Sequence, residues 1–303
     1  MSQSRLRNAV MPLRSALVAL AIGCAVAGDA GAQNRDAFLA GQTNDCHACN
    51  LEGAHLDRRD LTGADLSQAN LRDVTFSRTV LRNANLSGAD LTGAQLKRRD
   101  LTGARLIGAR LAGATFHRAI LRGADLSGAD LTGANLNVAI LTSAKFANAT
   151  LVQALLFQAE AGGADFTGAN LTAALMGSAR LISARLDDAN LSFADLFEAR
   201  LTNATLRRAT LTEANLTGAT LLRADLAGAM GERALFTRAG LRNANLSRAV
   251  LHGADFFQAD LGEADLSGAE LQSSRLLAAK LFNANQTDTQ FQGAIMPDNS
   301  VHP

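Results

Sequence analysis

The sequence predicts an all-β solenoid made of short extended segments joined by tight turns. Leu or Phe recurs at every fifth residue from Leu51 to Phe291, and this frame never slips. Ala fills most of the positions two residues before these apolar residues. A period of five fits neither the 3.6 of a helix nor the 2.0 of a flat strand, so each unit must turn the chain through about a quarter circle. Only four of the 49 repeat positions carry another residue, namely Ala161, Met176, Gly231 and Gln286.

Each five-residue unit combines a small, a polar and a large apolar residue with two residues that favour a turn. Gly occupies the second place after the central Leu or Phe in 17 of the 49 units, and Asn, Asp or Ser fills many others. These residues tolerate the positive φ that tight turns require. Four such units close a square, with the central residue and the preceding Ala facing inward and the other three residues facing water.

The motif A(D/N)L(T/S)G, seen in residues 124–128 and 129–133, resembles the pentapeptide repeat family. The resemblance covers nearly all of the chain after Leu51. It implies a right-handed quadrilateral parallel β-helix of about twelve coils, roughly 58 Å long at the spacing of neighbouring strands. Each central residue would then stack on the one twenty positions away. Both open ends need a cap, since exposed strand edges pair with other chains.

The unbroken frame predicts a single solenoid over residues 46–294. A cap segment at 33–45 precedes it, and a C-terminal tail at 295–303 follows. The frame is weakest at residues 160–163, where Ala161 replaces the central Leu and two glycines follow, and at Gly231. We interpret both as loosened coils rather than domain boundaries.

Residues 1–32 have the order of a secretory signal peptide. An apolar run at 16–27 follows several arginines, and Ala30 and Ala32 form an A-x-A cleavage site before Gln33. The run is too short for a transmembrane helix. Cleavage removes three Arg and one Asp, which changes the net charge from +1 to −1, so no bulk charge favours nucleic acid or an anionic membrane. The arginines are Arg5, Arg7 and Arg14.

A bacterial lipoprotein signal is the alternative for this segment. Residues 20–24 end at Cys24, which would be the acylated residue. Ala21 stands where such signals usually carry Leu, and Arg14 leaves a short apolar segment. A membrane partner is therefore expected only if Cys24 is lipidated.

Cys46 and Cys49 lie where the repeat begins, and the frame places both thiols inside the first coil. Many pentapeptide repeat proteins resemble this chain in opening with Cys-x-x-Cys-(D/N)-Leu. Three interpretations compete: a disulfide formed in an oxidising compartment, two packed free thiols, or a metal or redox site that uses His47 or His55. A covalent haem requires His directly after the second Cys, where this chain has Asn50.

Four arginines recur at intervals of twenty residues and should project from one face of successive coils. They form the arginine ladder: Arg58, Arg78, Arg98 and Arg118. Like charges about 5 Å apart repel each other and favour an anionic partner. Arg59 and Arg99 replace inward Ala and are expected to bend outward and loosen their corners.

A salt-bridged, solvated face is the alternative for the arginine ladder, because charge runs usually have this role. The carboxylates nearby in sequence that could neutralise it are Asp57, Asp60, Asp73 and Asp100.

Further along the same face, large apolar residues take outward positions that elsewhere carry Thr, Ser, Asn or Asp. Such a stripe suggests contact with another protein or a second copy of this chain. The alternatives are a stripe covered by the chain's own tail, or drift in a tolerant repeat. The apolar stripe consists of Leu155, Phe157, Leu175, Phe197, Leu235, Phe257 and Leu277.

The residue inventory argues against catalysis, since the chain has no Trp or Tyr, few His and no phosphate-binding loop. We assign no catalytic or metal-binding residue and no cofactor. The sequence favours a non-enzymatic exported β-solenoid, periplasmic or secreted, that acts as a rigid interaction scaffold in the bacterial envelope. Its expected partner is another protein or a second copy, with no nucleic acid. The alternatives are an anion- or metal-binding solenoid and, less favoured by the charge, a nucleic-acid mimic that protects topoisomerases.

Overall fold

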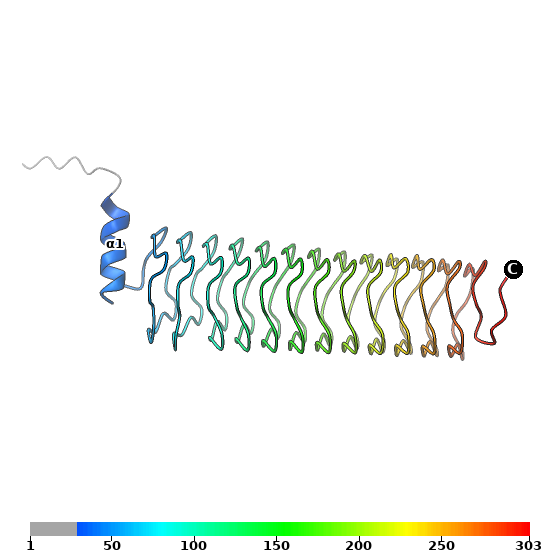
Figure 1. The fold of residues 1–303 in the computed structure, drawn as a ribbon. Helices are drawn as coiled ribbons and strands as arrows, with labels where there is room; N and C mark the ends of the chain where they lie inside the picture. The colour runs from blue at the N-terminus through cyan, green and yellow to red at the C-terminus, as the bar shows by residue number, and fades with distance from the viewer. Residues whose placement is uncertain (1–28) are drawn as a thin grey trace, which may run out of the picture.

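The computed structural model describes residues 29–303, which wind into a rod of stacked coils (Figure 1). Successive coils are joined by parallel bridges between residues twenty apart, from Asp45↔Asp65 to Arg275↔Ile295. Each bridge involves the single residue before a central Leu or Phe. Within residues 29–303 the paired segments are therefore one residue long, and four of them complete each coil.

The interior holds the central Leu or Phe and the preceding Ala, as the repeat predicts. Leu131, for example, is fully buried. Stacked rings give the coil spacing directly, because Phe146 and Phe166 lie 4.8 Å apart and nearly parallel, as do Phe236 and Phe256. This is the distance between neighbouring strands of a sheet. Burial of each Leu contributes about 1.5–3 kcal/mol toward the cost of ordering the chain.

A tight turn follows every central residue. In the first complete unit the Ala54 amide donates to the Leu51 carbonyl over 2.9 Å, and the third residue of the turn, Gly53, has a φ of +65°. A positive φ at that place alone is the signature of a type II turn. This requirement explains why the position is so often Gly, and why Arg58 adopts a φ of +61° there.

The Asp or Asn of the motif accepts hydrogen bonds from the turn that follows it. The Oδ1 atom of Asp130 accepts hydrogen bonds from the Thr132 amide at 3.0 Å and from its hydroxyl at 2.6 Å. Asp65 and Ser67 repeat this arrangement, and these hydrogen bonds lower the pKa of Asp65. The motif therefore pairs Asp or Asn with Thr or Ser because the two side chains bind each other.

The square cross-section gives the rod four faces, which we name by their central residues. Face A carries the units centred on residues 56, 76, 96 and every twentieth residue after them. Faces B, C and D start in the same way at residues 61, 66 and 71. The arginine ladder and the apolar stripe both belong to face A.

Neither weak point in the repeat interrupts the rod. The Ala161 amide still donates to the Arg180 carbonyl at 2.8 Å, and the side chain of Ala161 is buried. At Gly231, a Cβ would lie 2.8 Å from Cδ2 of Leu251, so the neighbouring Leu fills the space of the missing side chain. The loosening expected at these units is therefore absent, because neighbouring coils hold the backbone in register.

Helix α1 (Asp29–Leu39) lies across the N-terminal end of the rod (Figure 1). Its Phe38 is fully buried, and the guanidinium of Arg59 lies 4.1 Å above the Phe38 ring. Arg35 Nε also donates to the Asn50 carbonyl at 2.9 Å. The expected signal segment lies outside the described residues except for its last four positions, which fall within α1.

The C-terminal tail folds back on the last coil. Val301 pairs antiparallel with Ile295, and the His302 amide donates to the Ala294 carbonyl at 2.9 Å. This covers only part of the rod's end, since Leu281 is half-buried and Gln286 is exposed. In residues 29–303, no helix is long and apolar enough to cross a membrane.

Candidate interaction face

Cys46 and Cys49 are buried at the start of the first coil, and the structure joins them in a disulfide. Their sulfur atoms lie 2.17 Å apart. His47 and His55 lie on different faces, and each ring binds a hydroxyl one coil away, Ser67 and Thr75 respectively, at 2.9 Å. Among residues 29–303, no cluster of three or more His, Cys, Asp or Glu could hold a metal ion.

All four members of the arginine ladder are exposed, and in the described part of the chain none has a carboxylate within salt-bridge distance. Their φ values lie between +57° and +61°, so the four side chains leave the backbone in the same direction. Stacked coils therefore place them in register along face A. The alternative of a neutralised ladder is not what the structure shows.

Three of the four neighbouring carboxylates are occupied elsewhere. Oδ1 of Asp57 accepts the Ser77 amide at 2.8 Å, and Asp60 accepts the Thr62 amide at 3.0 Å. Asp100 accepts from Thr102 and pairs with Arg82 at 2.5 Å. These three side chains serve the turns or another arginine instead, and the fourth, Asp73, makes no salt bridge to the ladder among residues 29–303.

The two arginines in inward slots behave differently from each other. Arg59 stacks on Phe38, with its Nη1 atom buried and without a hydrogen-bond partner, so it covers the end of the rod rather than bending into solvent. Arg99 Nε donates to the Lys97 carbonyl at 2.8 Å. Burial lowers the pKa of Arg99, and the charge of Asp57 acts in the opposite direction.

A depression of about 200 Å³ lies beside Arg99 at the edge of face A. Sequence reasoning identified Arg99 as anomalous but did not predict this depression. The sequence did contain a sign of this depression, because an Arg at a position that otherwise holds Ala is too large for it and must change the packing of its neighbours. The lining residues are Thr75, Phe76, Ser77, Gln95, Lys97 and Arg99.

The apolar stripe is less uniform than the repeat suggests. Four members are between 41% and 47% exposed: Phe157, Leu175, Phe197 and Leu235. The other three members are less exposed, and each is half-buried: Leu155, Phe257 and Leu277. The guanidinium of Arg275 lies 4.4 Å above the Phe257 ring and shields it. The coil centred on Leu216 interrupts the stripe with Asn215 and Thr217.

Other exposed apolar residues are scattered over the remaining faces, one or two on each. They are Ile107 on face C, Phe193 and Met230 on face D, and Phe282 on face B. Sequence reasoning did not single them out, although each stands at an outward position of the frame. Only face A gathers four, so the concentration on that face exceeds scattered surface hydrophobicity.

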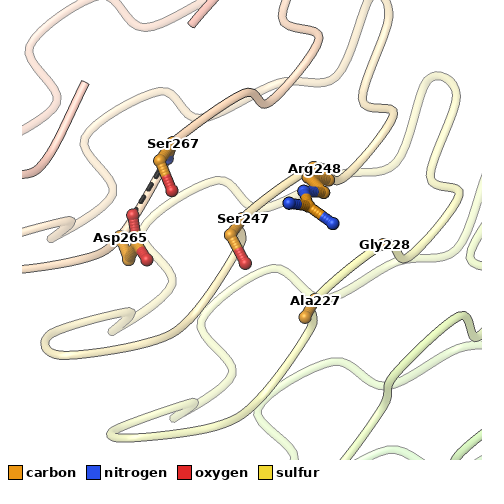
Figure 2. Close-up of a pocket in the computed structure, with 6 residues that line it drawn as sticks. All are labelled: Ala227, Gly228, Ser247, Arg248, Asp265 and Ser267. Atoms are coloured by element: carbon orange, nitrogen blue, oxygen red, sulfur yellow. Dashed lines mark hydrogen bonds between the residues drawn. The ribbon is translucent and has the colours of Figure 1, made fainter. Parts of the chain in front are cut away.

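A larger depression, of about 350 Å³, lies on face C near the C-terminal end (Figure 2). It forms where Ala227 and Gly228 leave space beside Arg248 and Ser247. The one carboxylate in its lining, Asp265, already accepts the Ser267 amide at 3.0 Å, as the dashed line marks. This depression follows from small side chains in the repeat, and its charged groups do not converge on a common point.

A family model described as pentapeptide repeats (8 copies) matches the chain over residues 45–98, 100–229 and 234–296. These matches cover most of the chain and coincide with its stacked coils. The chain therefore belongs to the pentapeptide repeat family, whose members form right-handed β-helix solenoids. No curated protein matches the chain significantly.

Several solved structures of the same family are similar to this chain. HetL, a protein involved in heterocyst differentiation regulation from the cyanobacterium Nostoc, is 34% identical, with 88% of this chain and 97% of HetL covered and a TM-score of 0.28. A protein from the Arabidopsis thaliana thylakoid lumen is 28% identical over 44% and 70% of the two chains, with a TM-score of 0.22. QnrB1, a plasmid-mediated fluoroquinolone resistance protein, is 19% identical over 81% and 90%, with a TM-score of 0.27.

Proposed function

We propose that this protein is an exported, non-enzymatic scaffold whose apolar stripe binds another protein, in the simplest case a second copy of itself. The observation that carries the proposal is the set of four exposed apolar side chains on one flat face, Phe157, Leu175, Phe197 and Leu235. They stand directly before or after the central residue in the face A units centred on residues 156, 176, 196 and 236, so one straight partner surface can contact all of them. Large apolar side chains gathered on one exposed face are typical of interaction surfaces.

The architecture supports a scaffold role. The twenty-residue register from Asp45 to Ile295 supports about twelve coils, and neighbouring coils share backbone hydrogen bonds on every face. A rod of this kind has a filled interior and presents fixed side-chain rows to a partner. Enzymes instead gather reactive groups in a cleft.

Two features support export. The N-terminal residues 1–32 have the order of a secretory signal, and a disulfide such as Cys46–Cys49 persists mainly in oxidising compartments. The rival role of a nucleic-acid mimic requires a strongly negative surface and cytoplasmic access. The expected mature charge of −1 and the free arginine ladder do not favour it.

Export is tested by fractionation and N-terminal sequencing of the mature protein. We expect a chain that begins at Gln33 outside the cytoplasm. An acylated Cys24 would assign the lipoprotein route, and an intact Met1 in the cytosol would remove export from the proposal.

Self-association is tested by sedimentation velocity over a range of concentrations. The variant carries Phe157→Ser, Phe197→Ser and Leu235→Ser, and it should shift the protein toward monomer with the β-solenoid circular dichroism unchanged. A matched control removes three exposed apolar residues from the other faces, with Ile107→Ser, Phe193→Ser and Phe282→Ser. An equal shift in this control, or a wild-type protein that is monomeric at high concentration, would refute self-association through face A.

A further inference from the structure

The arginine ladder carries charge that the rest of the rod does not compensate. Many other arginines are paired, such as Arg207 with Asp225 at 2.6 Å and Arg208 with both oxygens of Asp188 at 2.7 Å. The ladder side chains instead repeat at the coil spacing, which the stacked Phe rings place at 4.8 Å. Two like charges that far apart repel by about 1 kcal/mol even in bulk water. A row of anions with the same spacing would relieve this repulsion.

The depression beside Arg99 lies next to the middle of the ladder, between the coils that carry Arg78 and Arg98. Lys97 and Arg99 supply two cations to it, and neither has a carboxylate within salt-bridge distance among residues 29–303. Burial lowers the pKa of Arg99, and the negative charge of Asp57 raises it by a smaller amount. Its Oδ1 atom is already bound by the Ser77 amide and, at 3.4 Å, by the Thr75 hydroxyl.

The uncharged lining narrows the chemistry of a ligand. The Thr75 hydroxyl and the Gln95 amide already hydrogen-bond within the rod, which leaves the Ser77 hydroxyl as the uncharged polar group for a ligand. A hydroxyl beside two cations suits a sugar that carries both hydroxyls and a carboxylate, and because phosphate oxygens accept the same donors, the experiment must compare the two. Single-stranded nucleic acid usually needs exposed aromatic rings for its bases, and Phe76 and Phe116 of this region are buried.

We propose that the N-terminal half of face A binds a linear acidic polysaccharide with one carboxylate per sugar. One sugar occupies the depression, where Lys97 and Arg99 bind its carboxylate. The arginine ladder binds those carboxylates of the neighbouring sugars that turn toward face A. This site is independent of the apolar stripe, which lies on later coils.

The probe is an oligomer of galacturonic acid, titrated into the mature protein by calorimetry at low and moderate ionic strength. The double variant Arg78→Asn and Arg98→Asn keeps a residue that tolerates positive φ and removes two charges. We expect binding to weaken by about tenfold or more and to become less sensitive to salt. The matched control, Arg223→Asn with Arg248→Asn, removes two exposed and unpaired turn arginines from other faces and should bind like wild type.

A second variant tests the depression without endangering the fold. Arg99→Ala installs the residue that most units carry in this slot, so the rod should melt at the wild-type temperature or above. Affinity for the uronate oligomer should fall by about tenfold.

Three results would each overturn the proposal: wild-type affinity in Arg99→Ala, equal loss in the control pair, or no binding at low ionic strength. Tighter binding of polyphosphate or single-stranded DNA than of the uronate would overturn the sugar as the ligand. Sedimentation of the same variants separates this site from the apolar stripe, since their association state should not change.

Discussion

The two ends of the rod are finished in different ways. At the N-terminal end, α1 buries Phe38, Arg59 stacks on that ring, and the Cys46–Cys49 disulfide lies in the first coil. At the C-terminal end, the tail pairs with one side of the last coil and leaves Phe282 71% exposed. The N-terminal end is covered by a helix that does not belong to the repeat, whereas the C-terminal end is only partly covered by the tail that continues the repeat.

This difference shows how a solenoid tolerates an unfinished end. An internal coil packs against neighbours on both sides, whereas a terminal coil has one neighbour. At the C-terminal end the repeat weakens accordingly, with Gln286 in a central slot and Thr289 in a slot that usually holds Ala. The Thr289 hydroxyl donates to the Leu266 carbonyl at 2.8 Å, so its polar group is satisfied near solvent.

The largest effect is expected from a charge placed in the middle of the rod. Leu131→Asp buries an unpaired carboxylate and removes a stacked side chain, which should lower the free energy of unfolding by about 4 kcal/mol or more. Leu281→Asp at the half-covered end should cost about 1 kcal/mol or less, because the new carboxylate reaches water. Urea denaturation measures both, and similar losses would mean that the last coil is as well packed as the middle.

The control for Leu131→Asp must respect the turn. The position after Leu131 faces outward, but the Thr132 amide and hydroxyl both donate to Asp130. A second carboxylate there would oppose the first. Thr132→Ser keeps the hydroxyl and should leave the unfolding curve nearly unchanged.

The helix cap is expected to give the next largest effect. Phe38→Ala removes a fully buried ring and the partner of Arg59, and it should cost about 3 kcal/mol. Phe282→Ala deletes the same side chain at the exposed end and should cost almost nothing. Thermal melting of the two variants tests whether the ends differ in this way. Equal melting temperatures would show that α1 does not stabilise the first coil.

The cysteine pair should contribute less, because the bond closes a loop of only four residues. Loop-closure entropy for so short a loop gives about 2 kcal/mol. Cys46→Leu with Cys49→Ala places the repeat's own residues in both slots, which preserves packing without the bond. This variant should be less stable than the oxidised protein by that amount and equal to the reduced one. Thiol labelling of the denatured, unreduced protein should find no free thiol, and two labelled thiols would contradict the disulfide.

The repeat predicted the interior of the rod residue by residue, since a five-residue period with a fixed frame leaves one way to place Leu and Ala. A cap segment was expected at residues 33–45, but its helical form and its start at Asp29 were not, because these residues lie outside the frame and carry no apolar period of their own. The sequence also left open whether nearby carboxylates neutralise the arginine ladder. Sequence neighbours such as Asp57 look like partners, but their oxygens bind turn amides in the next coil. Hydrogen bonds between residues twenty positions apart in the sequence decide such pairings, and the spacing of residues that are close in sequence does not reveal them.

The smallest expected effect concerns acid, and it compares the two ends once more. Hydrogen bonds from Ser67 lower the pKa of Asp65 near the N-terminal end, and those from Ser300 lower the pKa of Asp298 in the tail. A carboxyl with a depressed pKa stabilises the fold above its unfolded pKa of about 3.9, and this contribution is lost as the pH falls through the folded value. Asp65→Asn keeps an oxygen acceptor but cannot titrate, so it should reduce the loss of stability between pH 5 and pH 2 (roughly the window of these pKa values).

Asp298→Asn should leave the global unfolding curve unchanged at both pH values, because the tail can open while the rod stays folded. Its effect should instead appear as altered hydrogen exchange at the His302 amide, which binds Ala294. A change in global acid stability from Asp298→Asn would show that the tail unfolds together with the rod.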